Sequence, residues 1–301
     1  MSAEGATVLT TDVLATAARD HYVRALKVLP PDVKVALTDA RAREREPRAR
    51  EILGTMLRNI EVAEQRGLMV CQDTGTPVFR VRVGRRFPFD RLGGHAITEA
   101  LATGVRRATA EHPLRSSVCH PLTRENPQTN TGWRIPVVDW EFLVDGETLE
   151  LSMMPKGSGS ENMSFLRMLP PAAGMAGIKR FVVECVLEAG GKPCPPTVVG
   201  IGIGGTADLC VKLAKEAIWR PIGKHHADPE LARLERDLLE AINLTGLGPM
   251  GLGGDTTALA VMVEAAYTHI TQNPVAVTLQ CWRGERASAR IFPDGQVEHG
   301  V

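Results

Sequence analysis

An apolar, glycine-rich segment, PTVVGIGIGG at residues 196–205, constrains the fold of this chain more than any other stretch. Its Val and Ile residues and its short length predict a buried strand. A segment with helical spacing follows at 206–219, and strands that alternate with helices are typical of proteins that pack helices on a sheet. The glycines at this junction allow the backbone to approach a neighbouring element or a ligand closely.

The periodicity of the whole chain predicts a mixed α/β fold, rich in helices, with an N-terminal helical layer and a mixed sheet. Apolar residues at helical spacing predict that layer over about residues 9–66. Later helices are expected at 93–110, 172–189, 206–219, 229–244 and 256–270, and strands at 78–84, 135–144, 148–155, 196–205, 274–282 and 287–292. Asp145-Gly146 predicts a hairpin turn between two of these strands. No linker divides the chain, so we expect a single domain over residues 1–301.

Composition excludes several classes of protein. The 35 Lys and Arg residues balance the 35 Asp and Glu residues, so the chain has no bulk attraction to nucleic acid or to an anionic membrane. We interpret the arginine-rich run at 40–50 as a solvated helix face, because Glu44 and Glu46 interrupt its positive charge. No apolar run approaches the roughly 18–20 residues of a membrane span, and residues 1–14 lack a targeting pattern. We therefore expect a cytoplasmic protein with reduced thiols.

The six cysteines are too few for a disulfide scaffold in a chain of 301 residues. Cys185 and Cys210 lie on the apolar faces of predicted helices, where we expect small core residues. Cys119 lies in a polar loop and fits either role. Three other cysteines follow a strand or lie in a rigid turn, where a side chain can point into a site: Cys71, Cys194 and Cys281.

The spacing of these three cysteines leaves two interpretations open. They are 123 and 87 residues apart, which does not fit a zinc site with local Cys pairs. Three thiolates from distant loops suit a [4Fe-4S] cluster in which one iron lacks a protein ligand and acts as a Lewis acid. From spacing alone, three ordinary buried thiols are the commoner explanation.

Glycine loops and nearby cations provide candidate anion-binding groups. Residues 200–205 fit the pattern GxGxxG, but the acidic residue that a dinucleotide site needs at the end of a second strand is missing, and residues 246–251 fit the same pattern without a preceding strand. Backbone N–H groups at two helix N-termini remain possible anion ligands. The candidate cations for a carboxylate are Arg115, Arg124, Lys156 and His269, although a surface role is commoner for any one of them. We expect His225-His226 to be exposed.

Six motifs taken in order resemble one known family. They are CQDTGTPVF from Cys71, the stretch from Arg115 to NTG at 130–132, KGSGSENMS from Lys156, CPPTVVGIGIGGTAD from Cys194, GLGPMGLGGDTTAL from Gly246 and LQCW at 279–282. Together they resemble the α subunit, or N-terminal domain, of the class I fumarate hydratase and L(+)-tartrate dehydratase family. The resemblance extends over about residues 10–292.

The resemblance implies an oxygen-sensitive hydro-lyase that holds a [4Fe-4S] cluster with one labile, substrate-binding iron. It places the cluster ligands at Cys71, Cys194 and Cys281. It implies that Gln72, Asp73, Arg115, Gly204 and His269 contact the substrate, with Asp73 and His269 as the catalytic candidates and Lys156 as a further binding cation. The loop at Lys156 has Ser158 where the family has a glycine.

The implied reaction is the reversible hydration of fumarate to L-malate, a step of the tricarboxylic acid cycle. The alternatives are the α subunit of an L(+)-tartrate dehydratase and a non-catalytic module of the same fold that binds a small anion. In this family the presumed base and further cations lie in a second domain or β subunit, and this chain ends at Val301. We therefore expect a β-subunit partner, a small dicarboxylate substrate and a higher oligomer.

Overall fold

The computed structural model describes residues 9–89 and 92–300. The chain forms two compact units, which we describe separately. Unit 1 comprises residues 1–30, 62–156 and 285–301, and unit 2 comprises residues 31–61 and 157–284. The expected mixed α/β class is confirmed, with two mixed sheets in place of one. The expectation of a single domain over 1–301 stays a prediction.

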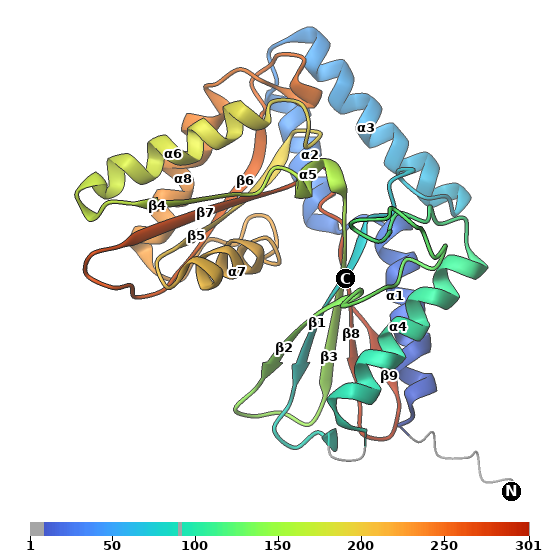
Figure 1. The fold of residues 1–301 in the computed structure, drawn as a ribbon. Helices are drawn as coiled ribbons and strands as arrows, with labels where there is room; N and C mark the ends of the chain where they lie inside the picture. The colour runs from blue at the N-terminus through green and yellow to red at the C-terminus, as the bar shows by residue number, and fades with distance from the viewer. Residues whose placement is uncertain (1–8, 90–91, 301) are drawn as a thin grey trace, which may run out of the picture. The chain divides into compact units, whose positions relative to one another are not determined.

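Unit 1 packs two helices against a five-stranded sheet (Figure 1). Its elements are α1 (Thr11–Lys27), β1 (Thr76–Val83), α4 (Gly93–Glu111), β2 (Val137–Phe142), β3 (Leu149–Lys156), β8 (Ala287–Ile291) and β9 (Val297–His299). The strand order is β2-β1-β3-β8-β9. Every second residue of β1 is buried, as its alternating sequence predicts. Helices α1 and α4 approach so closely at Gly104 that a Cβ there would lie 2.4 Å from the Ala15 carbonyl oxygen.

The hairpin expected at Asp145-Gly146 is wrong. Strand β1 lies between β2 and β3, parallel to the first and antiparallel to the second. The connection from β2 to β3 crosses the end of β1, where the Gly84 N–H donates to the Thr148 carbonyl at 2.9 Å. A turn dipeptide indicates only that the chain reverses, whereas the pairing of the strands depends on residues more than 50 positions away.

Unit 2 is a four-stranded sheet with helices on both faces. Its elements are α2 (Pro31–Arg43), the first part of α3 (Pro47–Arg66), α5 (Ser158–Glu161), β4 (Phe165–Leu169), η2 (Pro171–Ala173), α6 (Gly174–Ala189), β5 (Thr197–Ile203), α7 (Ala207–Ala217), α8 (Pro229–Asn243), η3 (Pro249–Gly251), β6 (Ala258–Ala265) and β7 (Asn273–Gln280). The strand order is β4-β7-β5-β6. Figure 1 shows α6 and α8 on one face and α7 on the other.

The glycines of β5 bring α7 directly onto the sheet. A Cβ at Gly202 would lie 2.0 Å from the Cys210 carbonyl oxygen, and one at Gly200 would lie 2.3 Å from that of Ala214. Neither glycine has a positive φ, so their role is to leave room for the helix. The glycine pattern that resembles a dinucleotide motif is therefore explained in part by the packing of helix on strand.

The helix expected at 256–270 is wrong, because residues 258–265 form strand β6. β6 runs parallel to β5 with Ile201 opposite Val263. The sequence ALAVMVEA is a continuous apolar run without period, and such a run fits a buried strand as well as a buried helix. The tertiary pairing decides between them. Consequently the loop at 246–254 leads into a strand and supplies no helix N-terminus.

The expected helical content of residues 9–66 is confirmed and consists of α1, α2 and α3, but these helices are divided between the units. The charged run at 40–50 is more than a solvated face. Glu44 is only 1% exposed, and its carboxylate accepts hydrogen bonds from the backbone N–H groups of Asp255 at 2.9 Å and Thr256 at 3.0 Å. Glu44 thus holds the segment that directly follows the glycine loop at 246–254.

Candidate functional site

In unit 1, the loop that contains Cys71, Gln72 and Asp73 is fixed by a buried tyrosine. The hydroxyl of Tyr22, on α1, donates to the carbonyls of Thr74 at 2.9 Å and Gly75 at 3.2 Å. Burial raises the pKa of Tyr22 well above its usual value, so this hydroxyl stays a donor. Within the loop, the Asp73 carboxylate accepts from the Gly75 N–H at 3.0 Å.

The predicted binding residue Arg115 is held through its backbone carbonyl. This oxygen accepts from the Thr74 hydroxyl at 2.9 Å and from the Asn130 amide at 3.0 Å. Asn130 is fully buried and also accepts from the Ser117 N–H at 2.7 Å. Two of the motifs that carried the resemblance, residues 71–79 and the stretch from Arg115 to 130–132, therefore meet at one carbonyl group. Sequence reasoning assigned no role to Thr74 or Asn130.

Lys156 lies at the end of β3, beside the same loop. It is 3% exposed and pairs with Thr76 in the register of β1 and β3. Gly75 has φ +67°, and a Cβ there would lie 2.9 Å from the Lys156 backbone nitrogen. Only glycine fits this approach. Unit 1 thus brings Cys71, Gln72, Asp73 and Lys156 onto adjacent backbone, while the exposed Arg115 is connected to them through Thr74.

In unit 2, Cys194 and Cys281 meet at one end of the sheet. Cys281 directly follows β7, whereas Cys194 lies three residues before β5 in a turn where its φ is +55°. The Trp282 N–H donates to the Cys194 carbonyl at 3.2 Å. Because β5 and β7 are antiparallel, the start of one strand and the end of the other lie side by side. Strand pairing therefore unites two residues that are 87 positions apart.

Two other predicted residues, Gly204 and His269, lie at the opposite end of this sheet. Gly204 follows the last residue of β5, and its N–H donates to the Pro274 carbonyl at 2.9 Å. His269 is exposed in the loop between β6 and β7, where its Nδ1 lies 2.9 Å from the Thr271 hydroxyl. A strand of seven residues spans about 23 Å. Unit 2 by itself does not bring these residues together with Cys194 and Cys281.

The other cysteines have different surroundings. Cys185 and Cys210 are buried in the apolar cores on opposite faces of the unit 2 sheet, as the sequence predicted. Burial raises the pKa of Cys185 to about 12 and that of Cys210 to about 11. Both thiols therefore stay protonated at neutral pH and are poor metal ligands. Cys119 is half-buried in a loop of unit 1.

The three predicted ligands are cysteines, the residue type that binds iron–sulfur clusters. None of the six cysteines forms a disulfide. Cys281 follows a strand and Cys194 lies in a turn, as expected, but the strand expected before Cys71 is wrong, because residues 67–75 form an irregular segment between α3 and β1. Cys71 belongs to unit 1, and Cys194 and Cys281 belong to unit 2. Among residues 9–89 and 92–300, no three His, Cys, Asp or Glu side chains are gathered in an arrangement that could hold a metal ion.

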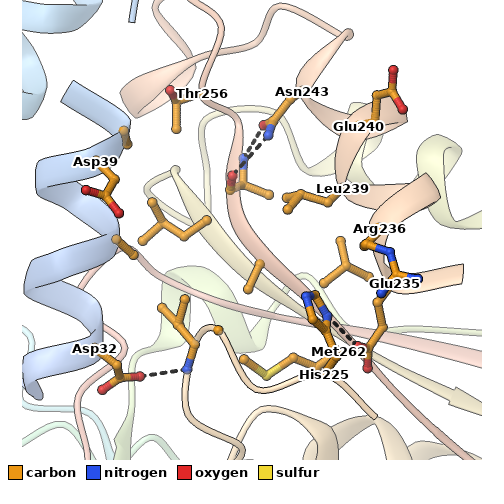
Figure 2. A pocket seen from close by; sticks show the side chains of 18 of the residues that line it. Asp32, Asp39, His225, Glu235, Arg236, Leu239, Glu240, Asn243, Thr256 and Met262 are labelled. Atoms are coloured by element: carbon orange, nitrogen blue, oxygen red, sulfur yellow. Dashed lines mark hydrogen bonds and ion pairs between the residues drawn. The ribbon is translucent and has the colours of Figure 1, made fainter. Parts of the chain in front are cut away.

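A separate cavity of about 750 Å³ lies in unit 2 beside α2, α8 and the edge strand β6 (Figure 2). None of the nine predicted site residues lines it. At its lower end in Figure 2, His225 contacts the buried carboxylate of Glu235 at 3.1 Å. Glu235 also accepts from Arg220 at 2.6 Å and from the Val263 N–H at 3.0 Å. The His226 N–H also donates to Glu235, at 3.1 Å. Both histidines therefore contact a carboxylate that is bonded to the backbone of β6, a structural role that the sequence did not indicate.

In the part of the chain that the structure describes, no helix is both long and apolar enough to cross a bilayer.

Comparisons with known proteins agree with the motifs. A family profile described as Fumarate hydratase (Fumerase) matches residues 15–290. A Methanocaldococcus jannaschii protein, provisionally named L(+)-tartrate dehydratase subunit alpha, is 48% identical over 271 residues, which cover 89% of this chain and 94% of the relative. The L(+)-tartrate dehydratase subunit alpha of Escherichia coli strain UTI89 is 34% identical over 88% of this chain and 86% of its own length. The protein of that name from strain K12 is 33% identical over the same shares.

The profile spans nearly the whole chain, and these relatives exceed 30% identity over most of their length. The chain therefore belongs to the class I fumarate hydratase and L(+)-tartrate dehydratase α-subunit family of iron–sulfur hydro-lyases.

Proposed function

We propose that this chain is the α subunit of an iron–sulfur L(+)-tartrate dehydratase, which removes water from a small hydroxydicarboxylate. The names of the relatives support tartrate ahead of fumarate, the reverse of the order that the motifs suggested. The structural observation that carries the proposal is the hydrogen bond from Trp282 to the Cys194 carbonyl. It joins two of the three presumed ligand segments in unit 2.

Cys71, Cys194 and Cys281 would hold the [4Fe-4S] cluster. When bound, such a cluster supplies an open iron that acts as a Lewis acid toward an oxygen of the substrate. The absence of a disulfide at any of the three and the turn conformation at Cys194 support this assignment. The high pKa values of Cys185 and Cys210 argue against either as a substitute ligand.

The remaining residues of this chain would bind and orient the substrate. The Arg115 guanidinium offers two parallel donors to a carboxylate, on a backbone that Thr74 and Asn130 hold in place. Lys156 adds a second positive charge, and its burial strengthens attraction to an anion. Gln72 would donate to a substrate oxygen, and Asp73 would accept a proton or a hydroxyl hydrogen bond.

A substrate-binding role for His269 and Gly204 stays a proposal without support from proximity, because unit 2 places both residues at the far end of the sheet from Cys194. If His269 contacts substrate, it does so from an exposed loop. An activity lost in His269→Ala with the cluster unchanged would support that role.

We further propose a β subunit as partner, because the relatives are named as α subunits. It would supply the groups that complete proton transfer. The assembly would be a higher oligomer, working in the cytoplasm, where thiols stay reduced.

Kinetics distinguish the candidate functions. The full chain is reconstituted with iron and sulfide without oxygen, alone and with its β subunit, and assayed on L(+)-tartrate, L-malate and fumarate. The proposal expects a brown protein with about four irons per chain, turnover only with the β subunit, and the highest kcat/KM on L(+)-tartrate. The highest kcat/KM on fumarate or L-malate would establish the second candidate. A folded but colourless protein would establish a non-catalytic anion-binding module and overturn both.

A further inference from the structure

Two buried polar side chains at the cysteine end of the unit 2 sheet have no hydrogen-bond partner among the described residues. The amide of Gln280 lacks one on both its nitrogen and its oxygen, and the hydroxyl of Thr197 also lacks one. Gln280 is 1% exposed and Thr197 is 2% exposed. A buried polar group without a partner costs about 1–3 kcal/mol. Native proteins rarely keep such groups unless water or a bound group satisfies them.

The positions of these side chains relate them to the presumed cluster ligands. Gln280 immediately precedes Cys281, and Thr197 follows Cys194 after two prolines. The register of β5 and β7 pairs Val198 with Gln280. Continued by one residue, the same register sets Thr197 across from Cys281, so Thr197 lies on the face of Cys281 and Gln280 lies on the opposite face. Both side chains thus belong to the segments that would carry two ligands.

Residues 157–164, which contain α5 and lead into β4, also pack near this end of the sheet. Gln280 lies on the same face as Thr278, two residues before it, and the hydroxyls of Thr278 and Ser164 lie 3.4 Å apart. A Cβ at Gly159 would lie 2.9 Å from the Lys192 carbonyl oxygen, in the turn that leads to Cys194. Gln280 itself is 1% exposed, so its amide has little access to bulk water.

We infer that Gln280 and Thr197 are positioning residues that donate hydrogen bonds to sulfur when Cys194 and Cys281 hold the cluster. Donors aimed at the sulfurs stabilise the more negative, reduced state of a cluster and so raise its reduction potential. Outer hydrogen bonds of this kind also retain the metal, and their loss typically costs 10–100-fold in affinity. The inference rests on the proposed function, since it requires a cluster at these cysteines.

The test uses the full chain, reconstituted without oxygen, with Thr197→Val and Gln280→Met as near-isosteric changes. Thr278→Val is the matched control, because Thr278 lies on the same strand and the same face as Gln280 and is as deeply buried as Thr197. Two properties are measured. The first is the midpoint potential of the cluster, obtained by dye-mediated titration followed by electron paramagnetic resonance. The second is the rate at which a chelator bleaches the absorbance of the cluster at about 400 nm.

We expect both changes to make the potential more negative and to speed cluster loss on the order of tenfold. Thr278→Val should stay within about twofold of the wild-type rate, and Thr197→Ser, which keeps the hydroxyl, should restore it. If Gln280→Met does not fold by circular dichroism, Thr197→Val and Thr197→Ser carry the test. A stable cluster with unchanged potential and rate in Thr197→Val would overturn the inference alone and assign the buried groups to trapped water. A wild-type chain that takes up no cluster would overturn the proposed function together with it.

Discussion

The backbone N–H of Trp282 donates a 3.2 Å hydrogen bond to the carbonyl of Cys194. This contact links the segment after β7 to the turn before β5. It fixes the backbone of both cysteines through main-chain atoms alone. The Met250 N–H adds a second bond, at 2.8 Å, to the carbonyl of Pro195. The cysteine end of unit 2 is therefore built from three separate loops.

Replacement of any one proposed ligand should abolish cluster binding. Cys71→Ser, Cys194→Ser and Cys281→Ser each remove a thiolate that a [4Fe-4S] cluster needs. Cys185→Ala is the matched control, because its thiol is buried and its pKa is raised to about 12. Iron content and visible absorbance after anaerobic reconstitution measure the result. Normal iron content in Cys194→Ser, or loss of iron in Cys185→Ala, would contradict the assignment.

Loss of the Asn130 side chain should weaken both stability and substrate binding. The change removes the donor to the Arg115 carbonyl and the acceptor for Ser117, which should cost about 1–3 kcal/mol of unfolding free energy. Asn130 has φ +54°, so Asn130→Ala should cost about 1 kcal/mol more than Asn130→Gly. Urea unfolding gives these values, and a rise in KM reports the displaced Arg115. Equal stability of wild type and Asn130→Gly would show that the contacts are unimportant.

Glu235 should make the stability of the protein depend on acid pH. Burial opposes ionisation of this carboxyl, but hydrogen bonds from the Val263 N–H and Arg220 outweigh burial and hold its pKa below the usual value. The charged form therefore stabilises the fold above the unfolded pKa of about 4.3, and this contribution is lost as pH falls through the folded pKa.

The comparison of Glu235→Gln with wild type isolates this contribution. The variant should lose about 3 kcal/mol at pH 7, because it removes one of the two carboxylates that pair with the Arg220 guanidinium, the one that is almost fully buried. As the pH is lowered from 5 to the point of acid unfolding, its Tm should fall less steeply than that of wild type. Glu240→Gln, on the exposed face of the same helix, should change stability by no more than about 0.5 kcal/mol. Parallel acid profiles for Glu235→Gln and wild type would refute the role of Glu235.

Gly202→Ala should be strongly destabilising. The added methyl group would lie 2.0 Å from the Cys210 carbonyl oxygen, so α7 would have to move off β5, at a cost of about 3 kcal/mol or more. Gly94→Ala is the control: its Cβ would meet nothing nearer than the Phe89 ring at 3.4 Å, and it lies in α4, where alanine favours the helix by up to about 1 kcal/mol. Denaturant midpoints compare the two. A tolerated Gly202→Ala would argue for a ligand role of this glycine.

Local patterns in the sequence were sufficient to predict many of the helices and strands and to identify the candidate residues of unit 1. The helical spacing at 9–66 and the alternation in β1 depend on neighbours in the chain, and the structure confirms both. The motif at 71–75 also indicates its own turn, because the Asp73 carboxylate accepts from the N–H of Gly75, two residues later. Where a residue's environment is set by its nearest neighbours, its sequence context is informative.

Only the tertiary structure decided what depends on pairing between distant segments. ALAVMVEA is a strand because β5 offers it an edge, and the Asp145-Gly146 turn makes no hairpin because β1 lies between its strands. The fold also separated His269 from Cys281 along β7 and left the Gln280 amide buried without a partner among the described residues. The sequence by itself determined the family and the three candidate thiols. Strand register, a property of two segments at once, determined which of the candidate residues lie together.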